Sequence, residues 1–175
     1  MGLQMAPSLT RVEQSFLAQL QAIFDSTGKG PRPLKRSSYQ FLLAYGWFYT
    51  PQPLPKKAAP GAVGECYNNA LKLVLDDPGL MYIEGFAAGG DGLPIHHAWA
   101  TDGTGRAIDI TWATPGVIYV GVPFKAGWVS LMGLKYKGVG GLLDDWEHDW
   151  PLLRGLGDEP EKWLELKGRG AKKLT

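Results

Sequence analysis

The sequence predicts an α+β protein in which helices pack on an antiparallel sheet of about four strands. Two observations predict this class. Apolar residues recur at helical spacing in the N-terminal part of the chain and again after Cys66, and four short strand-like runs follow one another between residues 81 and 123. We therefore expect one domain over residues 1–175, with its core between about residues 37 and 124 and a flexible tail at 167–175.

The composition limits the classes of protein to which the chain can belong. Its 175 residues can bury a core of ordinary size, and 45% hydrophobic with 20% charged residues is typical of a soluble globular protein. A net charge of +1 provides no strong basic field, which argues against nucleic acid as a partner. We find no secretory signal and no apolar run long enough for a membrane, so we expect no membrane association and a cytoplasmic location.

Three segments with apolar residues at helical spacing precede the first strand, and they cover residues 8–27, 37–45 and 66–75. Ser8 or Thr10 can cap the first helix, and Gly28 stands where it should stop. Prolines end the second helix, so that residues 50–63 are expected as an extended surface connection to the third.

Glycine-rich turns separate the strand-like runs, which cover residues 81–88, 95–101, 107–112 and 117–123. The segment GGDG precedes the second run and DGTG precedes the third. Residues 128–136 are expected as a short helix or strand, and residues 142–153 as an acidic helix that carries tryptophan. The sheet therefore follows the third helix directly.

The stretch from Gly64 to Trp112 concentrates the reactive side chains. Cys66 is the single cysteine, so it cannot form an internal disulfide and is either structural or reactive. A thiol attacks carbonyl groups as its thiolate, which a helix N-terminus and a neighbouring histidine both stabilise. Cys66 opens a predicted helix, and His97 lies on a predicted strand. We expect Cys66 to be a nucleophile and His97 its general base.

The turn between the second and third strands determines whether Asp109 can orient His97. A three-residue loop over 102–104 places His97 directly opposite Asp109, and a bulged loop over 103–105 makes them diagonal neighbours on the same face. Loops of two or four residues separate them. The glycines of DGTG favour the odd-length loops, so we expect Asp109 to be the third member of a triad.

These residues resemble the transglutaminase-like branch of the papain-type cysteine fold. The matching pieces are Gly64-x-Cys66 at a helix start, His97-Ala98-Trp99 on a strand and Asp109-x-Thr111-Trp112 on the next strand. Residues 64–124 as a whole are similar to short proteins of bacteria and their viruses. The resemblance implies a papain-like α+β fold with a Cys-His-Asp site. Family members often have proline at the position of Ile110, and an acidic residue beside the cysteine is atypical of its crosslinking enzymes.

Two further residues are candidates for substrate binding. Glu84 lies in an apolar strand, where it either faces solvent at the sheet edge or contacts substrate. Trp99 shares the parity of His97 on its strand, so it can shape a groove there, whereas Trp112 has the opposite parity to Asp109 and is expected in the core. Asn69 is expected to bond neighbouring backbone.

The remaining histidines have plainer interpretations. His96 points to the opposite face from His97 and is expected to be packed or at the surface, and His148 lies on an acidic, solvated helix face. We expect no metal and no cofactor, although Cys66, His97 and Asp109 are possible ligands. The sequence does not identify the second hydrogen-bond donor of an oxyanion hole. The candidates are three residues that precede the nucleophile: Trp47, Tyr49 and Gln52.

The expected activity is cysteine-dependent acyl transfer or amide hydrolysis through a thioester at Cys66. The substrate would be a peptide, a protein or another amide. Water as acceptor would make the protein a protease, amidase or deamidase, and an amine would make it a transferase. The alternative is a binding domain that keeps the fold without catalysis.

Overall fold

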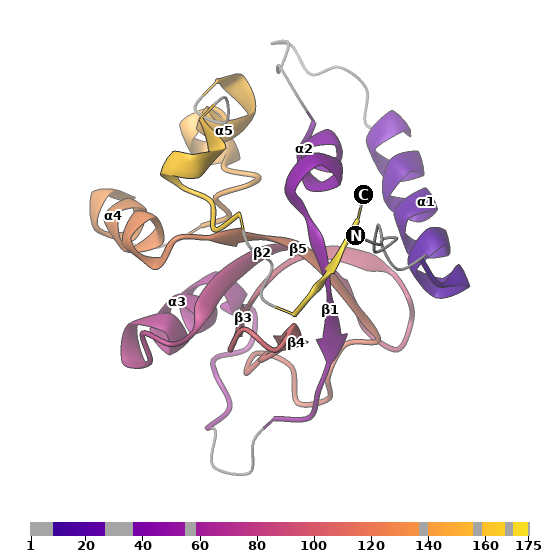
Figure 1. Cartoon of the computed structure of the whole chain (residues 1–175), viewed down its shortest axis with the longest axis horizontal. Coiled ribbons are helices and arrows are strands. Elements are labelled where there is room, and N and C mark those ends of the chain that lie inside the picture. The colour runs from indigo at the N-terminus through magenta and orange to yellow at the C-terminus, as the bar shows by residue number, and fades with distance from the viewer. Residues whose placement is uncertain are drawn as a thin grey trace, which may run out of the picture.

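The computed structural model of the chain describes residues 9–26, 37–54, 59–136, 140–155, 159–166 and 170–174. Within these residues, α-helices pack on an open and mainly antiparallel sheet, which confirms the α+β class (Figure 1). The α-helices are α1 (Arg11–Ser26), α2 (Ser38–Tyr45), α3 (Cys66–Asp76), α4 (Ala126–Tyr136) and α5 (Pro151–Arg154). The strands are β1 (Trp47–Pro51), β2 (Met81–Ala88), β3 (Pro94–Thr101), β4 (Arg106–Ala107), β5 (Ile118–Phe124) and β6 (Lys172–Lys173).

The first two helices begin with side chains that satisfy their unpaired N–H groups. Thr10 Oγ1 accepts from the N–H of Glu13 at 3.2 Å, and Glu13 Oε2 accepts from the N–H of Thr10 at 2.6 Å. Ser37 and Gln40 form the same reciprocal pair before α2. Thr10 is therefore the cap among the two candidates expected before the first helix, while Ser8 and Gly28 lie outside the described residues.

The sheet has six strands among the described residues rather than the expected four, in the order β3-β2-β5-β1-β4 with β6 also paired to β1. β1 runs antiparallel to β5 and β6 and parallel to β4. The expectation that residues 50–63 form only a surface connection is wrong at its start, because Thr50 and Pro51 pair with Arg106 and Ala107. Residues 55–58 lie outside the described part of the chain.

The C-terminal segment also differs from the expectation of a flexible tail. Lys172 and Lys173 pair with Phe48 and Trp47, and Leu174 is buried. Residues 167–169 and Thr175 lie outside the described residues. The acidic segment 142–153 is not one helix, since it contains a short 3₁₀ helix, η1 (Trp146–His148), followed by α5. Of the two alternatives for residues 128–136, helix is observed, as part of α4.

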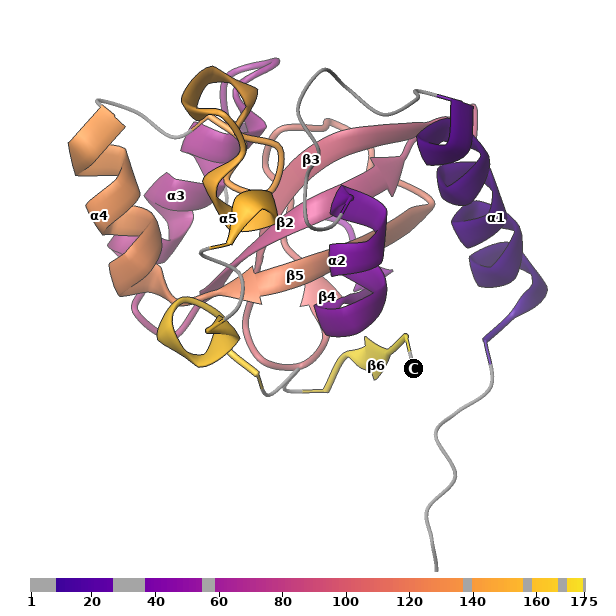
Figure 2. The ribbon, with the colours of Figure 1, turned by 90° about the horizontal axis from the view of Figure 1, so that it is seen from above.

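The sheet buries a separate apolar cluster on each face. The first joins strand residues such as Phe86 and Val120 to helix residues from all five α-helices, and it extends from Phe16 to Leu174, well beyond the expected limits of 37 and 124. The second consists mainly of strand residues, including Trp99 and Tyr119. The helices therefore pack on one face of the sheet. In Figures 1 and 2, α1 lies to the right of the sheet and α3 with α4 to the left.

The topology places the start of α3 beside an edge strand. β3 is the edge of the sheet, and α3 packs mainly against it. Ala70 and Val74 of α3 belong to the apolar cluster that also contains Ala98 and Ala100 of β3. Burial of these side chains fixes α3 along β3, and this brings the first residue of the helix to the histidines of the strand. No helix in the described residues is long and apolar enough to cross a lipid bilayer.

Candidate active site

His97 and Asp109 form a buried ion pair. The Nε2 atom of His97 lies 2.8 Å from Oδ2 of Asp109, and the side chains are 2% and 3% exposed. The backbone N–H of Thr111 donates to Oδ1 of Asp109 at 2.9 Å, and the hydroxyl of Tyr119 donates to Oδ2 at 2.9 Å. The Tyr119 hydroxyl in turn accepts from the N–H of Gly116. Two donors besides His97 thus hold the carboxylate, and the carboxylate in turn holds the imidazole.

The backbone between β3 and β4 explains why these two side chains meet. Ala100 pairs with Ile108 through two backbone hydrogen bonds, and in this register His97 and Asp109 are diagonal neighbours on one face. Gly105 has a φ of +79°, the left-handed conformation expected for a bulged loop over 103–105. The shared face of His97 and Asp109 is confirmed. The expected strand over 107–112 is wrong, because β4 ends at Ala107 and one isolated bridge follows it.

Cys66 is the first residue of α3 and is 8% exposed. Glu65 precedes it as N-cap but makes no capping hydrogen bond with its side chain, and its carboxylate instead accepts from Nδ2 of Asn68 at 2.7 Å. The first N–H groups of a helix have no partner within the helix. Since Glu65 does not cap them, they suit the stabilisation of negative charge that develops beside the Cys66 sulfur.

The thiol of Cys66 lies close enough to His97 to raise the pKa of the imidazole through hydrogen bonding and charge. Because Nε2 of His97 binds Asp109, Nδ1 is the ring nitrogen left for the sulfur. Burial lowers the pKa of His97, but hydrogen bonds to Asp109 and Cys66 and the charges of both groups outweigh it and raise this pKa to about 9. Burial raises the pKa of Asp109, and the hydrogen bond and charge of His97 outweigh it, so that this pKa lies below its ordinary value. His97 therefore interacts with both of the other residues predicted as a triad, and its imidazole favours its charged form.

Trp112 belongs to this site, although the sequence indicated a core residue. Its indole stacks on the imidazole of His97 with ring centroids 4.3 Å apart, and it is only half-buried. The prediction from strand parity failed because the chain leaves the strand after Ile108. The motif Asp109-x-Thr111-Trp112 was the available signal, since it placed an aromatic residue close to the acid in sequence.

Trp99 is on the face of His97, as expected from its parity, but it does not line a groove. It is 1% exposed and packs edge-on against Tyr49 and Tyr119 in the second apolar cluster. The assignment of Trp99 to substrate binding is therefore wrong. Trp99 packs in the apolar cluster beneath the site. Tyr49, one of three candidates for the oxyanion hole, belongs to the same buried cluster.

Glu84 is also corrected, since it neither faces solvent nor is accessible to a substrate. It is fully buried on β2, which lies inside the sheet between β3 and β5. Its carboxylate accepts from the backbone N–H groups of Leu142 at 2.8 Å and Leu143 at 2.6 Å, and from the hydroxyl of Tyr82 at 3.3 Å. Burial raises the pKa of Glu84 to about 7, while these hydrogen bonds oppose the shift. Glu84 anchors the segment that follows α4.

His96 lies on the opposite face of β3 from His97, which confirms the prediction. Its ring packs on Phe86 with centroids 4.2 Å apart, and its Nε2 lies 3.4 Å from Oδ2 of Asp144. Burial lowers the pKa of His96, and the negative charge of Asp144 opposes this shift. His96 is thus part of the contact between β3 and the segment that Glu84 anchors.

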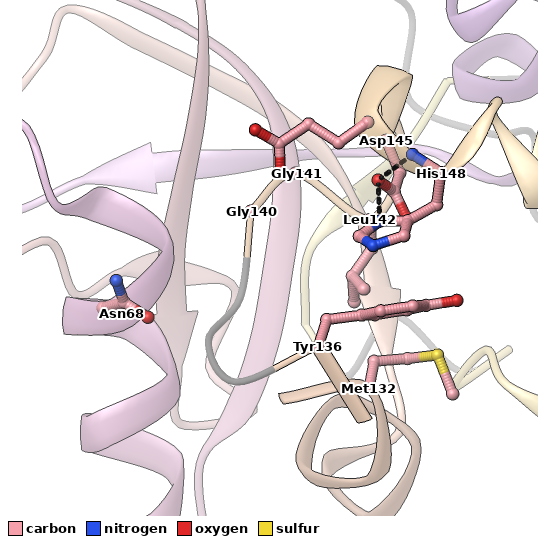
Figure 3. Close-up of a pocket in the computed structure, with 9 residues that line it drawn as sticks. Asn68, Met132, Tyr136, Gly140, Gly141, Leu142, Asp145 and His148 are labelled. Carbon is pink, nitrogen blue, oxygen red and sulfur yellow. Dashed lines mark hydrogen bonds and ion pairs between the residues drawn. The ribbon is translucent and has the colours of Figure 1, made fainter. Parts of the chain in front are cut away.

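A pocket of about 230 Å³ lies beside this segment. Figure 3 shows Asn68 of α3 on one side of the pocket and Met132 and Tyr136 of α4 on the other. His148 stacks on Tyr136 with ring centroids 3.6 Å apart, and its Nδ1 lies 2.7 Å from Oδ1 of Asp145. The residues that line this pocket do not include the three triad residues, so His148 and the triad belong to different places on the molecule.

Among the residues that the structure describes, no group of three or more His, Cys, Asp or Glu side chains is arranged to hold a metal ion. In comparisons with known proteins, the chain matches no protein-family model, no curated protein and no solved structure.

Proposed function

We propose that the protein is a cysteine hydrolase or acyltransferase that works through a thioester at Cys66. The observation that carries this proposal is the placement of one buried imidazole, His97, between the only thiol of the chain and a carboxylate held by three hydrogen bonds. This arrangement supplies a nucleophile, a base and an orienting acid in contact. The resemblance to the transglutaminase-like branch of the papain-type fold supports the same proposal.

Because His97 favours its charged form, the reaction begins from a thiolate of Cys66 whose proton is held at Nδ1 of His97. The sulfur then attacks the carbonyl carbon of an amide, and N–H groups at the start of α3 stabilise the oxyanion. The C–N bond breaks as His97 returns the proton to the leaving amine, which leaves a thioester on Cys66. In hydrolysis, His97 takes a proton from water, which attacks the thioester and releases a carboxylic acid and the thiol. An amine acceptor in place of water gives transfer.

Water is the default acceptor, because it is always present. The proposed substrate is a peptide, a protein or another amide. The proposed location is the cytoplasm, where a reducing environment keeps a lone thiol free.

A binding domain without catalysis is the second candidate. The observation that favours it is the small exposure of the site, since Cys66, His97 and Asp109 are 8%, 2% and 6% exposed. Such burial limits the access of a large substrate to the sulfur. The two candidates differ in the reactivity that they predict for the native thiol.

Alkylation by iodoacetamide distinguishes them, and the single cysteine makes the assay unambiguous. If His97 activates Cys66, the native protein should react rapidly at about pH 6, where an ordinary thiol with a pKa of about 8.5 is almost inert. His97→Ala should reduce the rate to that of the urea-unfolded chain. A folded wild-type protein whose cysteine stays unreactive at every pH would exclude catalysis and favour the binding domain.

A further inference from the structure

Asn69 lies on α3 one turn after Cys66 and is 8% exposed. Its amide makes three hydrogen bonds. Oδ1 accepts from the N–H of Ala62 at 3.2 Å, while Nδ2 donates to the carbonyl of Ala62 at 2.8 Å and to Oγ1 of Thr111 at 3.0 Å. The bonds to neighbouring backbone confirm the expectation from the sequence, and the bond to Thr111 was not foreseen. Asparagine is a weak helix former, so its use here depends on these contacts.

The bond between Asn69 and Thr111 connects two parts of the proposed triad. Thr111 donates its backbone N–H to Asp109, which binds His97, and His97 is the partner of Cys66. Asn69 and Cys66 lie three residues apart on one helix, so the spacing between them is rigid. These contacts form a closed cycle. Within it, the hydrogen bond from Asn69 to Thr111 joins α3, which carries Cys66, to the loop that carries Asp109.

Gly61 provides a second connection between the segment before α3 and the loop that carries Asp109. Its N–H donates to the carbonyl of Ile110 at 2.8 Å. A Cβ atom at Gly61 would lie only 2.5 Å from Cγ and Oδ1 of Asn69, so a larger residue would displace the amide. The backbone around Ala62 and around Ile110 belongs to no strand, which means that these side-chain and single backbone bonds hold the two segments together.

We propose that Asn69 is a positioning residue that fixes the nucleophile relative to the His97–Asp109 pair. This inference rests on the proposed function. When the bond to Thr111 is lost, the loop that carries Asp109 can shift against α3, and the distance between the sulfur and Nδ1 of His97 becomes variable. Proton transfer between these atoms requires hydrogen-bond distance, so the activated state of Cys66 is populated less.

The test compares Thr111→Val with Thr111→Ser. Valine removes the Oγ1 acceptor of Asn69 but keeps the shape of the side chain and the backbone N–H that Asp109 uses, whereas serine keeps the hydroxyl. Asn69→Ala removes the donor from the other side, and Leu75→Ala, at an exposed position of the same helix, is the control. The measurements are the pH profile of iodoacetamide alkylation and the titration of His97 by NMR.

We expect Thr111→Val and Asn69→Ala to slow alkylation at pH 6 by about 10-fold to 100-fold, a range typical of small displacements in a reacting geometry. Both should also lower the pKa of His97, while Thr111→Ser and Leu75→Ala match the wild type. A merely structural role would change the unfolding midpoint without changing either pH profile. Should Asn69→Ala fail to fold, the Thr111 pair still decides the outcome.

The failures of the two proposals are distinguishable. A reactive wild type whose pH profile and His97 titration are unchanged in Thr111→Val would overturn the positioning role alone. A wild type that is unreactive at pH 6 would overturn the proposed function, and the positioning role with it.

Discussion

The indole of Trp112 lies nearly parallel to the imidazole of His97, with 18° between the ring planes and 4.3 Å between the centroids. The ring covers one face of the base and separates it from water on that side. An aromatic face also attracts a cation electrostatically, so this contact favours the imidazolium form of His97.

Replacement of Trp112 should therefore lower the pKa of His97. We expect Trp112→Leu to reduce it from about 9 by about 0.4 to 0.7 of a unit, since a cation–π contact contributes roughly 0.5–1 kcal/mol where it is partly exposed. NMR titration of the ring protons measures this shift. Trp112→Phe keeps an aromatic face and should change the value less. An identical titration in Trp112→Leu and the wild type would show that the stacking has no electrostatic role.

Asp109→Asn tests the orientation of the base. The amide keeps the size of the carboxylate but removes its charge, so the pKa of His97 should fall from about 9 toward its ordinary value of about 6.5. Alkylation of Cys66 at pH 6 should slow by at least about tenfold, because the imidazole loses the partner that fixes its orientation and stabilises its charged form. Tyr119→Phe removes only one of the hydrogen bonds to Asp109 and should have a smaller effect of the same sign. Equal rates in Asp109→Asn and the wild type would remove Asp109 from the triad.

His97 should also make the stability of the fold depend on pH. Its pKa of about 9 in the folded chain exceeds the ordinary 6.5, so the folded state holds the proton more tightly than the unfolded chain. The resulting stabilisation is complete below about pH 6.5 and disappears as the pH rises through 9, and it amounts to on the order of 3 kcal/mol. Urea unfolding between pH 7 and 9.5 should show this decline in the wild type. His97→Gln should lack most of it, and a parallel decline in both proteins would contradict the assignment.

Removal of the Glu84 carboxylate should release the segment after α4. Glu84→Ala leaves the N–H groups of Leu142 and Leu143 without their acceptor, which we expect to destabilise the fold by on the order of 3 kcal/mol. Limited proteolysis should then cut residues 140–150 faster than in the wild type. Glu147→Ala, on the exposed surface of η1, is the control for loss of a carboxylate. Unchanged proteolysis in Glu84→Ala would mean that other contacts hold the segment.

The triad geometry could be predicted because it depends on local rules. The face shared by His97 and Asp109 followed from the length of one turn, and the position of Cys66 followed from the start of one helix. The bounds of β2, Met81–Ala88, match the expected strand because its turns and apolar run are continuous in sequence. Most of the correct predictions about the fold and the site therefore came from patterns within a single segment.

The errors arose where contacts join distant segments. A carboxylate at Glu84 can be buried only because Leu142 and Leu143 reach it from far along the chain, and no local pattern reports such a partner. Trp112 was misplaced because alternation of faces applies only while the chain remains in a strand. β1 and β6 were missed because both are short, and because β1 pairs with β4, β5 and β6, which all lie far along the chain from it.

The pairing of β6 with β1 affects the order in which the sheet can form during synthesis. β1 emerges from the ribosome early, yet the strand that pairs with Trp47 and Phe48 on its second edge consists of residues 172 and 173. Until these residues are made, the nascent chain presents a strand edge with two large aromatic side chains and unpaired backbone groups. Such an edge can pair with a neighbouring nascent chain. A chain truncated before residue 172 would therefore contain the complete proposed triad but have a greater tendency to aggregate.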